Sequence, residues 1–179
     1  MLQRQPIMTM QFTITEEESK KAKHPHDIFL LNLIFNHILI FVAILSASSL
    51  AHYIVVVPVL SIMSMIYLFI GASRAKTKAS WYVSGHWQLC AKRSRMFLIM
   101  ILIVSAIFVI LWFVSGGNLR PQHWALGGAA FFPAMLTVFA LIIMESEGLH
   151  HAKIGKLPDW VKQKYPQGSY EPAEEKEEK

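Results

Sequence analysis

The sequence has little charge and almost no cysteine. Charged residues make up 16% of its 179 residues, whereas a soluble domain carries about a quarter. Hydrophobic residues make up 54%. The one cysteine, Cys90, excludes an intrachain disulfide framework and a cysteine-rich metal site. The composition therefore indicates an integral membrane protein whose single thiol is reduced.

The sequence also lacks the motifs that assign common enzyme chemistry. It contains no GxSxG nucleophile elbow, no P-loop, no GxGxxG motif and no HExxH zinc motif. Its basic residues are not accompanied by a nucleic-acid recognition fold, so we expect no nucleic-acid partner. These absences favour a non-catalytic protein over an enzyme.

What the sequence does contain is four long apolar runs. Each is close to the roughly 20 residues that an α-helix needs to cross the hydrocarbon core of a bilayer. None of the runs contains Asp, Glu, Lys or Arg. They predict an all-α membrane protein with four transmembrane helices in two antiparallel hairpins, at residues 28–50, 53–71, 96–115 and 125–144.

Lysine and arginine alternate between the two sides of these runs. They are concentrated before residue 28, between residues 72 and 95 and after residue 144, and the turn before the fourth run holds only Arg120. The positive-inside rule therefore places both termini in the cytoplasm. The small size and the absence of a glycosylation sequon favour a bacterial plasma (inner) membrane.

The segments outside the membrane domain, 1–27 and 145–179, are expected to be cytoplasmic. Thr15 and Glu18 have the spacing of a capping box, which predicts a short helix that stops before Pro25. The stretch around Trp160 is expected to lie along the membrane surface. The acidic, proline-containing tail is expected to be disordered from about residue 167.

One ionisable residue, His37, lies inside the apolar runs. A buried imidazole needs a hydrogen-bonding partner where water is absent. If the first two runs form a tight hairpin about His52, Tyr67 lies at the same depth as His37. We therefore predict a structural hydrogen bond between His37 and Tyr67, with a proton, quinone or haem site at His37 as the alternative.

Several histidines lie at the predicted cytoplasmic face. Glu147 and His150 are three residues apart, so one helix face can present both to a metal ion. Carboxylate-bridged di-iron bundles need two such pairs, however, and the chain supplies one. We predict no bound cofactor and keep a metal or haem site as the alternative, with metal candidates Glu147, His150, His151, His24 and His26.

The polar segment between the second and third runs mixes aromatic and basic residues. Gly85 argues against one continuous helix, so the segment is expected to be a loop at the membrane interface. Tryptophan and arginine dominate binding energy in many interfaces, which makes the loop a candidate docking surface. Its proposed contact residues are Trp81, Tyr82, Trp87, Lys92, Arg93 and Arg95.

Two functional hypotheses remain from the sequence. The first is a non-catalytic accessory or assembly subunit that binds a larger membrane-protein partner as well as the lipid bilayer. It is favoured because the apolar runs hold no catalytic or coupling groups. The alternative is a small redox or metal- or haem-handling membrane protein that uses His37 or the cytoplasmic histidines.

Overall fold

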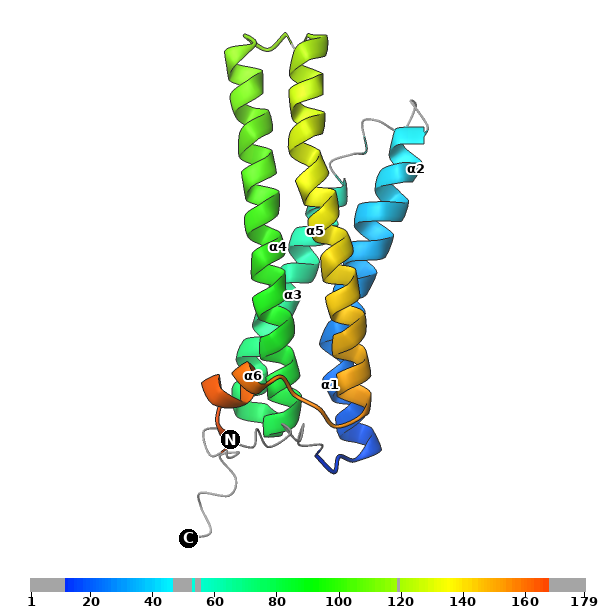
Figure 1. The fold of residues 1–179 in the computed structure, drawn as a ribbon, viewed down its shortest axis with the longest axis vertical. Coiled ribbons are helices and arrows are strands. Elements are labelled where there is room, and N and C mark those ends of the chain that lie inside the picture. Colours follow the sequence, from blue (N-terminus) through cyan, green and yellow to red (C-terminus); the bar gives the residue numbers. More distant parts are fainter. Residues whose placement is uncertain (1–11, 47–52, 54–55, 119, 168–179) are drawn as a thin grey trace, which may run out of the picture.

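The structure is a computed structural model that describes residues 12–46, 53, 56–118 and 120–167. The described residues form helices and no strand, and the long helices pack side by side (Figure 1). The elements are α1 (Glu16–Leu31), the π-helix η1 (Asn32–Ile40), α2 (Phe41–Ser46), α3 (Val56–Lys78), α4 (Trp81–Val114), α5 (Pro121–Lys153) and α6 (Asp159–Lys164).

Three of the described helices, α3, α4 and α5, are long and apolar enough to cross a membrane. This confirms that the fold is all-α and that three of its helices are suited to span a membrane. α1, η1 and α2 follow one another without interruption from Glu16 to Ser46. We call the end of the bundle where α1 and α4 begin and α3 and α5 end the basic end, because most of the described lysines and arginines lie there.

The start of α1 confirms the predicted capping box. The Thr15 hydroxyl accepts a hydrogen bond from the Glu18 backbone N–H at 3.1 Å, and the Glu18 carboxylate accepts one from the Thr15 backbone N–H at 3.1 Å. The Thr15 N–H, with a further hydrogen bond from Ser80, lowers the pKa of Glu18. These contacts satisfy backbone groups that a helix end otherwise leaves open.

α1 does not stop before Pro25, as the sequence had suggested, but continues through it. Proline inside a helix costs about 3 kcal/mol, because it removes one backbone hydrogen bond and crowds the preceding turn. Here Pro25 is itself buried, and Ala22, Phe29 and Leu33 are buried along the same stretch of helix. Packing of this face outweighs the local preference of proline.

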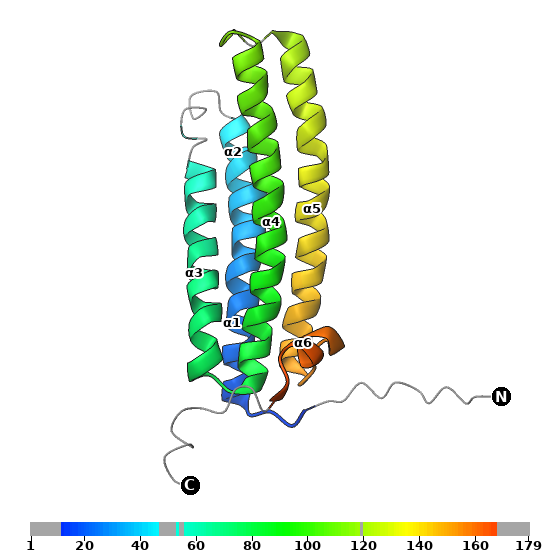
Figure 2. The same cartoon turned by 90° about the vertical axis from the view of Figure 1, so that its left-hand side faces the viewer.

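The first hairpin has a different register from the one predicted. Asn36 Nδ2 donates to the Val57 carbonyl at 2.8 Å, and Asn32 Nδ2 donates to Ser61 Oγ at 3.2 Å. Because Val57 lies level with Asn36, α2 extends beyond the start of α3, which Figure 2 shows. The predicted register, which set Tyr67 level with His37, is therefore wrong. The predicted turn about His52 itself lies outside the described residues.

The predicted loop between the second and third runs is largely helical, because residues 72–78 end α3 and residues 81–95 begin α4. α4 is continuous from Trp81, and Gly85 lies within it against Leu157. α6 packs on this part of α4, since Val161 is fully buried in a cluster with Tyr82, Leu89 and Leu157. The residues expected to be disordered from about 167 lie almost wholly outside the described part.

Gly155 joins the N-terminal strap, residues 12–15, to the segment between α5 and α6. Its φ is +70°, and its carbonyl accepts a hydrogen bond from the Phe12 N–H at 2.7 Å. A Cβ at this position would lie 2.1 Å from the Phe12 carbonyl oxygen. Gly116 has a similar φ of +60° but nothing within 4 Å of an added Cβ.

We therefore expect Gly155→Ala to destabilise the protein more than Gly116→Ala does. Both substitutions place a side chain in the left-handed region, at about 1 kcal/mol. Only Gly155→Ala adds a backbone clash, of about 1–3 kcal/mol by analogy with overpacked cores. Unfolding midpoints in detergent measure the difference. Equal midpoints for the two variants would show that the strap contributes no stability.

Candidate functional site

A cluster of buried polar side chains lies at the basic end, where α1, α4 and α5 meet beneath α6. We call it the polar cluster. None of His26, His86, Cys90 and Glu145 exposes any measurable surface, and Arg93 is 8% exposed. Removing such groups from water is costly unless each finds a partner, so their contacts with one another decide whether this end of the bundle is stable.

The carboxylate of Glu145 is held from two sides. Its Oε2 lies against His26 Nδ1 of α1, and its Oε1 accepts a hydrogen bond from Arg93 Nη1 of α4 at 3.2 Å. Arg93 Nη1 also donates to the Met144 carbonyl at 2.8 Å. One buried carboxylate of α5 thus joins α1 and α4.

Two histidines extend these contacts to the segment after α5. His26 Nε2 lies 3.0 Å from His86 Nδ1, and His86 Nε2 lies 3.2 Å from the Lys156 carbonyl oxygen. A carbonyl only accepts, so His86 carries its hydrogen on Nε2. Neutral His86 then accepts from His26 Nε2–H, which leaves His26 Nδ1 bare towards the carboxylate.

Three contacts in series connect Glu145 through His26 and His86 to the Lys156 carbonyl, and together they lack one hydrogen. If Glu145 is ionised and both imidazoles are neutral, only two N–H hydrogens are present for these three contacts. One contact would then bring two lone pairs together. A proton or another cation is required, and the carboxylate makes the contact between His26 and Glu145 the most favourable place for it.

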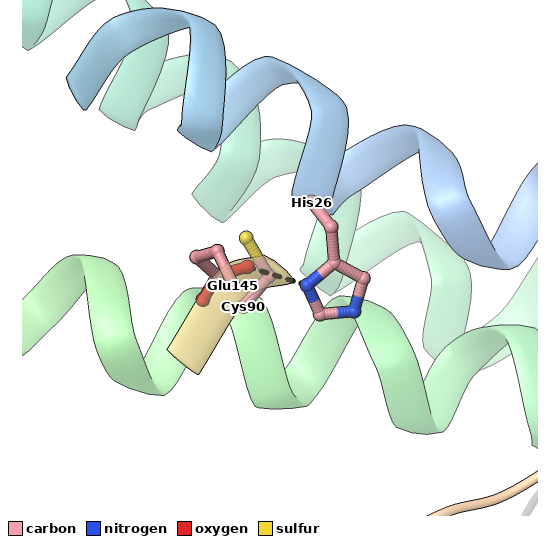
Figure 3. Close-up of side chains that lie close together, drawn as sticks. All are labelled: His26, Cys90 and Glu145. Carbon is pink, nitrogen blue, oxygen red and sulfur yellow. Dashed lines mark hydrogen bonds and ion pairs between the residues drawn. The ribbon is translucent and has the colours of Figure 1, made fainter. Parts of the chain in front are cut away.

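Cys90 adds a third donor at this point, as Figure 3 shows. His26 Nδ1, Cys90 Sγ and a carboxylate oxygen of Glu145 all lie within 4.8 Å of one another. The thiol donates a hydrogen bond to the Pro25 carbonyl at 3.3 Å. Nitrogen, sulfur and oxygen together suit a divalent transition ion of the zinc class, whose sites use these three ligand types.

The local sequence explains how these side chains converge. His86, Cys90 and Arg93 are spaced four and three residues apart, so α4 presents them on one face. Gly148 lets α5 approach that face and α1 closely. A Cβ at Gly148 would lie 2.7 Å from His26 Cε1 and 3.0 Å from Arg93 Nη1.

The predicted pair of His37 and Tyr67 is not formed. His37 Nδ1 lies 3.1 Å from the Asn32 carbonyl, and the Tyr67 hydroxyl lies 3.0 Å from His24 Nε2. The reason is the hairpin register, which moves Tyr67 towards the basic end by several residues relative to His37. A backbone carbonyl of its own helix satisfies His37 instead.

Of the five metal candidates predicted from sequence, the polar cluster contains only His26. Glu147 pairs with His151 at 3.8 Å along α5, and the ring centroids of His150 and His151 lie 6.3 Å apart. His24 faces Tyr67 on another side of α1. The predicted metal set did not include Glu145, Cys90 and His86. The four-residue spacing of His86 and Cys90 was the available signal, but it places both on one face only if the segment is a helix and not the predicted loop.

The predicted docking residues mostly pack within the chain. Trp81 Nε1 donates to the Tyr165 carbonyl at 2.7 Å, and the Tyr82 hydroxyl donates to the His151 carbonyl at 3.0 Å. Lys92 Nζ lies 3.9 Å from the centroid of the Trp160 ring. Arg93 belongs to the polar cluster, Trp87 is partly buried and Arg95 is exposed.

Replacing Arg93 by methionine tests the electrostatics of the polar cluster. Removing one partner of a buried ion pair costs about 3–5 kcal/mol, because the remaining charge stays buried without compensation. We expect Arg93→Met to lower the free energy of unfolding by this amount. Arg95→Met, which removes an exposed cation two residues away, should change it by less than about 0.5 kcal/mol. Similar effects of the two variants in detergent unfolding would contradict the claim that Arg93 compensates the buried charge of Glu145.

No protein-family model, curated protein or solved structure matches this chain. A functional assignment therefore rests on the chemistry of its side chains. Within the described residues, the polar cluster holds the one group of three or more potential metal ligands whose donor atoms converge.

Proposed function

We propose that this protein is a metal-binding membrane protein that holds one divalent transition ion of the zinc class. The ligands are His26 Nδ1, Cys90 Sγ and a carboxylate oxygen of Glu145. The observation that carries this proposal is the convergence of three buried donor atoms at a point where the contact between His26 and Glu145 needs a proton or another cation. Three protein ligands leave a fourth position for water or another small ligand.

The charges of the polar cluster suit such an ion. Without metal, Arg93, ionised Glu145, one shared proton and a neutral thiol carry a net charge of +1. A divalent ion would replace the shared proton and the proton of the Cys90 thiol. The net charge with the ion and the Cys90 thiolate is again +1. Exchange of one ion for two protons therefore leaves the electrostatic cost of burial nearly unchanged.

The neighbours of the three ligands serve as supports. Metal-bound histidine normally donates its second N–H to an acceptor that fixes its orientation, and His86 Nδ1 is placed to do this for His26 Nε2. Arg93 holds the other oxygen of Glu145. Arg93 also lines a cavity of about 310 Å³ beside α6, with Glu147, His151 and Lys156 in its wall. This cavity is the proposed direction of entry.

We further propose a fourth span, formed by η1, α2 and the end of α1. Residues 28–46 would be about 28 Å long as an α-helix, close to the thickness of the hydrocarbon core. The stretch is helical throughout and contains no Asp, Glu, Lys or Arg. By the positive-inside rule the basic end is cytoplasmic, in a plasma (inner) membrane of bacterial type, where a reducing compartment keeps Cys90 a thiol.

The accessory-subunit hypothesis stays a prediction. Most of the residues predicted to dock a partner make contacts inside the chain instead. A larger membrane protein could still bind through other faces. Metal binding is the better-supported function because named donor atoms converge for it.

Cobalt binding to the purified full-length protein tests the metal site. We expect one equivalent of Co²⁺ to bind, with a sulfur-to-cobalt charge-transfer band, and Zn²⁺ to displace it. Cys90→Ala should abolish the band. His86→Phe, which removes a support but no ligand, should keep the band and weaken binding by about 10–100-fold.

The matched controls are Glu147→Gln and His150→Gln, which lie outside the polar cluster on the same helix as Glu145. Both should bind Co²⁺ as the parent protein does. Absence of a charge-transfer band in the folded parent protein would refute the site. Loss of binding in the two controls together with retention in Glu145→Gln would place the metal elsewhere on α5.

Labelling with a membrane-impermeant maleimide tests the fourth span. In a Cys90→Ser background we expect Asn118→Cys to react in intact bacterial cells, and Thr77→Cys to react only after lysis. Glu16→Cys should behave like Thr77→Cys if residues 28–46 cross the membrane. Labelling of Glu16→Cys in intact cells would instead support three spans.

A further inference from the structure

A second hollow at the basic end lies on the opposite side of α1 from the polar cluster. It has a volume of about 650 Å³ and is lined by α1, α3 and the start of α4. We call it the cationic pocket. Its charged lining residues are Lys20 and Lys21 of α1 and Arg74 and Lys78 of α3. No carboxylate is among its lining residues.

The nearest carboxylates do not neutralise these cations firmly. Glu16 and Glu17 pair with Lys20 and Lys21, each at 2.7 Å, along the exposed surface of α1. All four of these side chains expose more than 60% of their surface. Such pairs contribute about 0–1 kcal/mol, so a phosphate can replace them readily.

The inner wall of the cationic pocket is aromatic. The Tyr67 hydroxyl lies 3.0 Å from His24 Nε2, and the Tyr67 and Trp87 ring centroids are 6.2 Å apart. Tyrosine and tryptophan at this position suit the boundary between headgroups and acyl chains, since each joins an apolar ring to a polar edge. The wall therefore separates a charged region from an apolar one.

An exposed apolar stripe leads away from the pocket along α3. Met63, Ile66, Tyr67 and Ile70 are 47–62% exposed and follow the spacing of one helix face. Tyr67 and Ile70 belong both to this stripe and to the pocket lining. Cations at one end and a continuous apolar stripe at the other match a molecule that has an anionic head and long apolar chains.

We propose that the cationic pocket binds an anionic phospholipid, with its phosphate among Lys20, Lys21, Arg74 and Lys78 and its acyl chains along the stripe on α3. The proposal needs only the membrane location and does not rest on metal binding. A free phosphate would meet the same cations but would leave the apolar stripe unused. Basic pockets between membrane helices favour anionic headgroups over zwitterionic ones for electrostatic reasons.

Native mass spectrometry of the delipidated full-length protein tests this assignment. Phosphatidylglycerol and phosphatidylcholine with identical acyl chains are the probes, and phosphatidylglycerol should be retained preferentially. Each cation near a headgroup contributes about fivefold, so Arg74→Gln with Lys78→Gln should weaken phosphatidylglycerol binding about 30-fold. Both side chains are exposed, so folding should be unaffected.

The matched control is Lys76→Gln with Arg95→Gln, which removes two cations from a neighbouring hollow at the same end. This control should bind phosphatidylglycerol as the parent protein does. Equal losses of phosphatidylglycerol binding in the two double variants would show that general surface charge causes the loss, and would overturn the proposal. Equal retention of the two lipids, or displacement of phosphatidylglycerol by millimolar inorganic phosphate, would overturn it as well. Cobalt binding by the Arg74→Gln, Lys78→Gln variant should be unchanged, which separates this test from that of the metal site.

Discussion

The structure depends on one buried carboxylate, that of Glu145. A carboxylate without water must have its charge balanced at short range. Its two partners, His26 and Arg93, come from α1 and α4, so the requirement fixes how three helices meet. The same requirement explains why α5 carries Gly148 one turn later, since a larger residue would separate the charges. Glu145 and His26 expose no measurable surface, so water does not reach this point.

The sequence predicted features that depend on local patterns. An apolar run long enough to cross a membrane forms a helix whatever its neighbours are. The capping box likewise depends only on Thr15 and Glu18 being three residues apart. The polar cluster depends instead on three helices, α1, α4 and α5, that are distant in the chain. Its α4 members lie in a stretch where Gly85 suggested a break, although the absence of a side chain there serves packing against Leu157. The pair of His37 and Tyr67 failed for a related reason. Depth in a hairpin follows from its register, which side chains such as Asn36 set by reaching the partner helix.

The two proposed sites share the same stretches of helix. His24 and His26 lie two residues apart on α1 and face different surroundings, the first towards Tyr67 and the second towards Glu145. Trp87 and His86 divide in the same way on α4, one lining the cationic pocket and the other joining the histidine contacts. α1 and α4 therefore contribute residues to both sites.

Complete burial of His26, Cys90 and Glu145 also sets a timescale. An ion bound at these donors would have no direct path to water, so it would leave only when the helices around it open locally. The residence time would then depend on the frequency of that opening as well as on the strength of the bonds to the metal. A competing chelator in the surroundings, however strong, must wait for the same event. The arrangement suits long-term retention of an ion more than its rapid transfer.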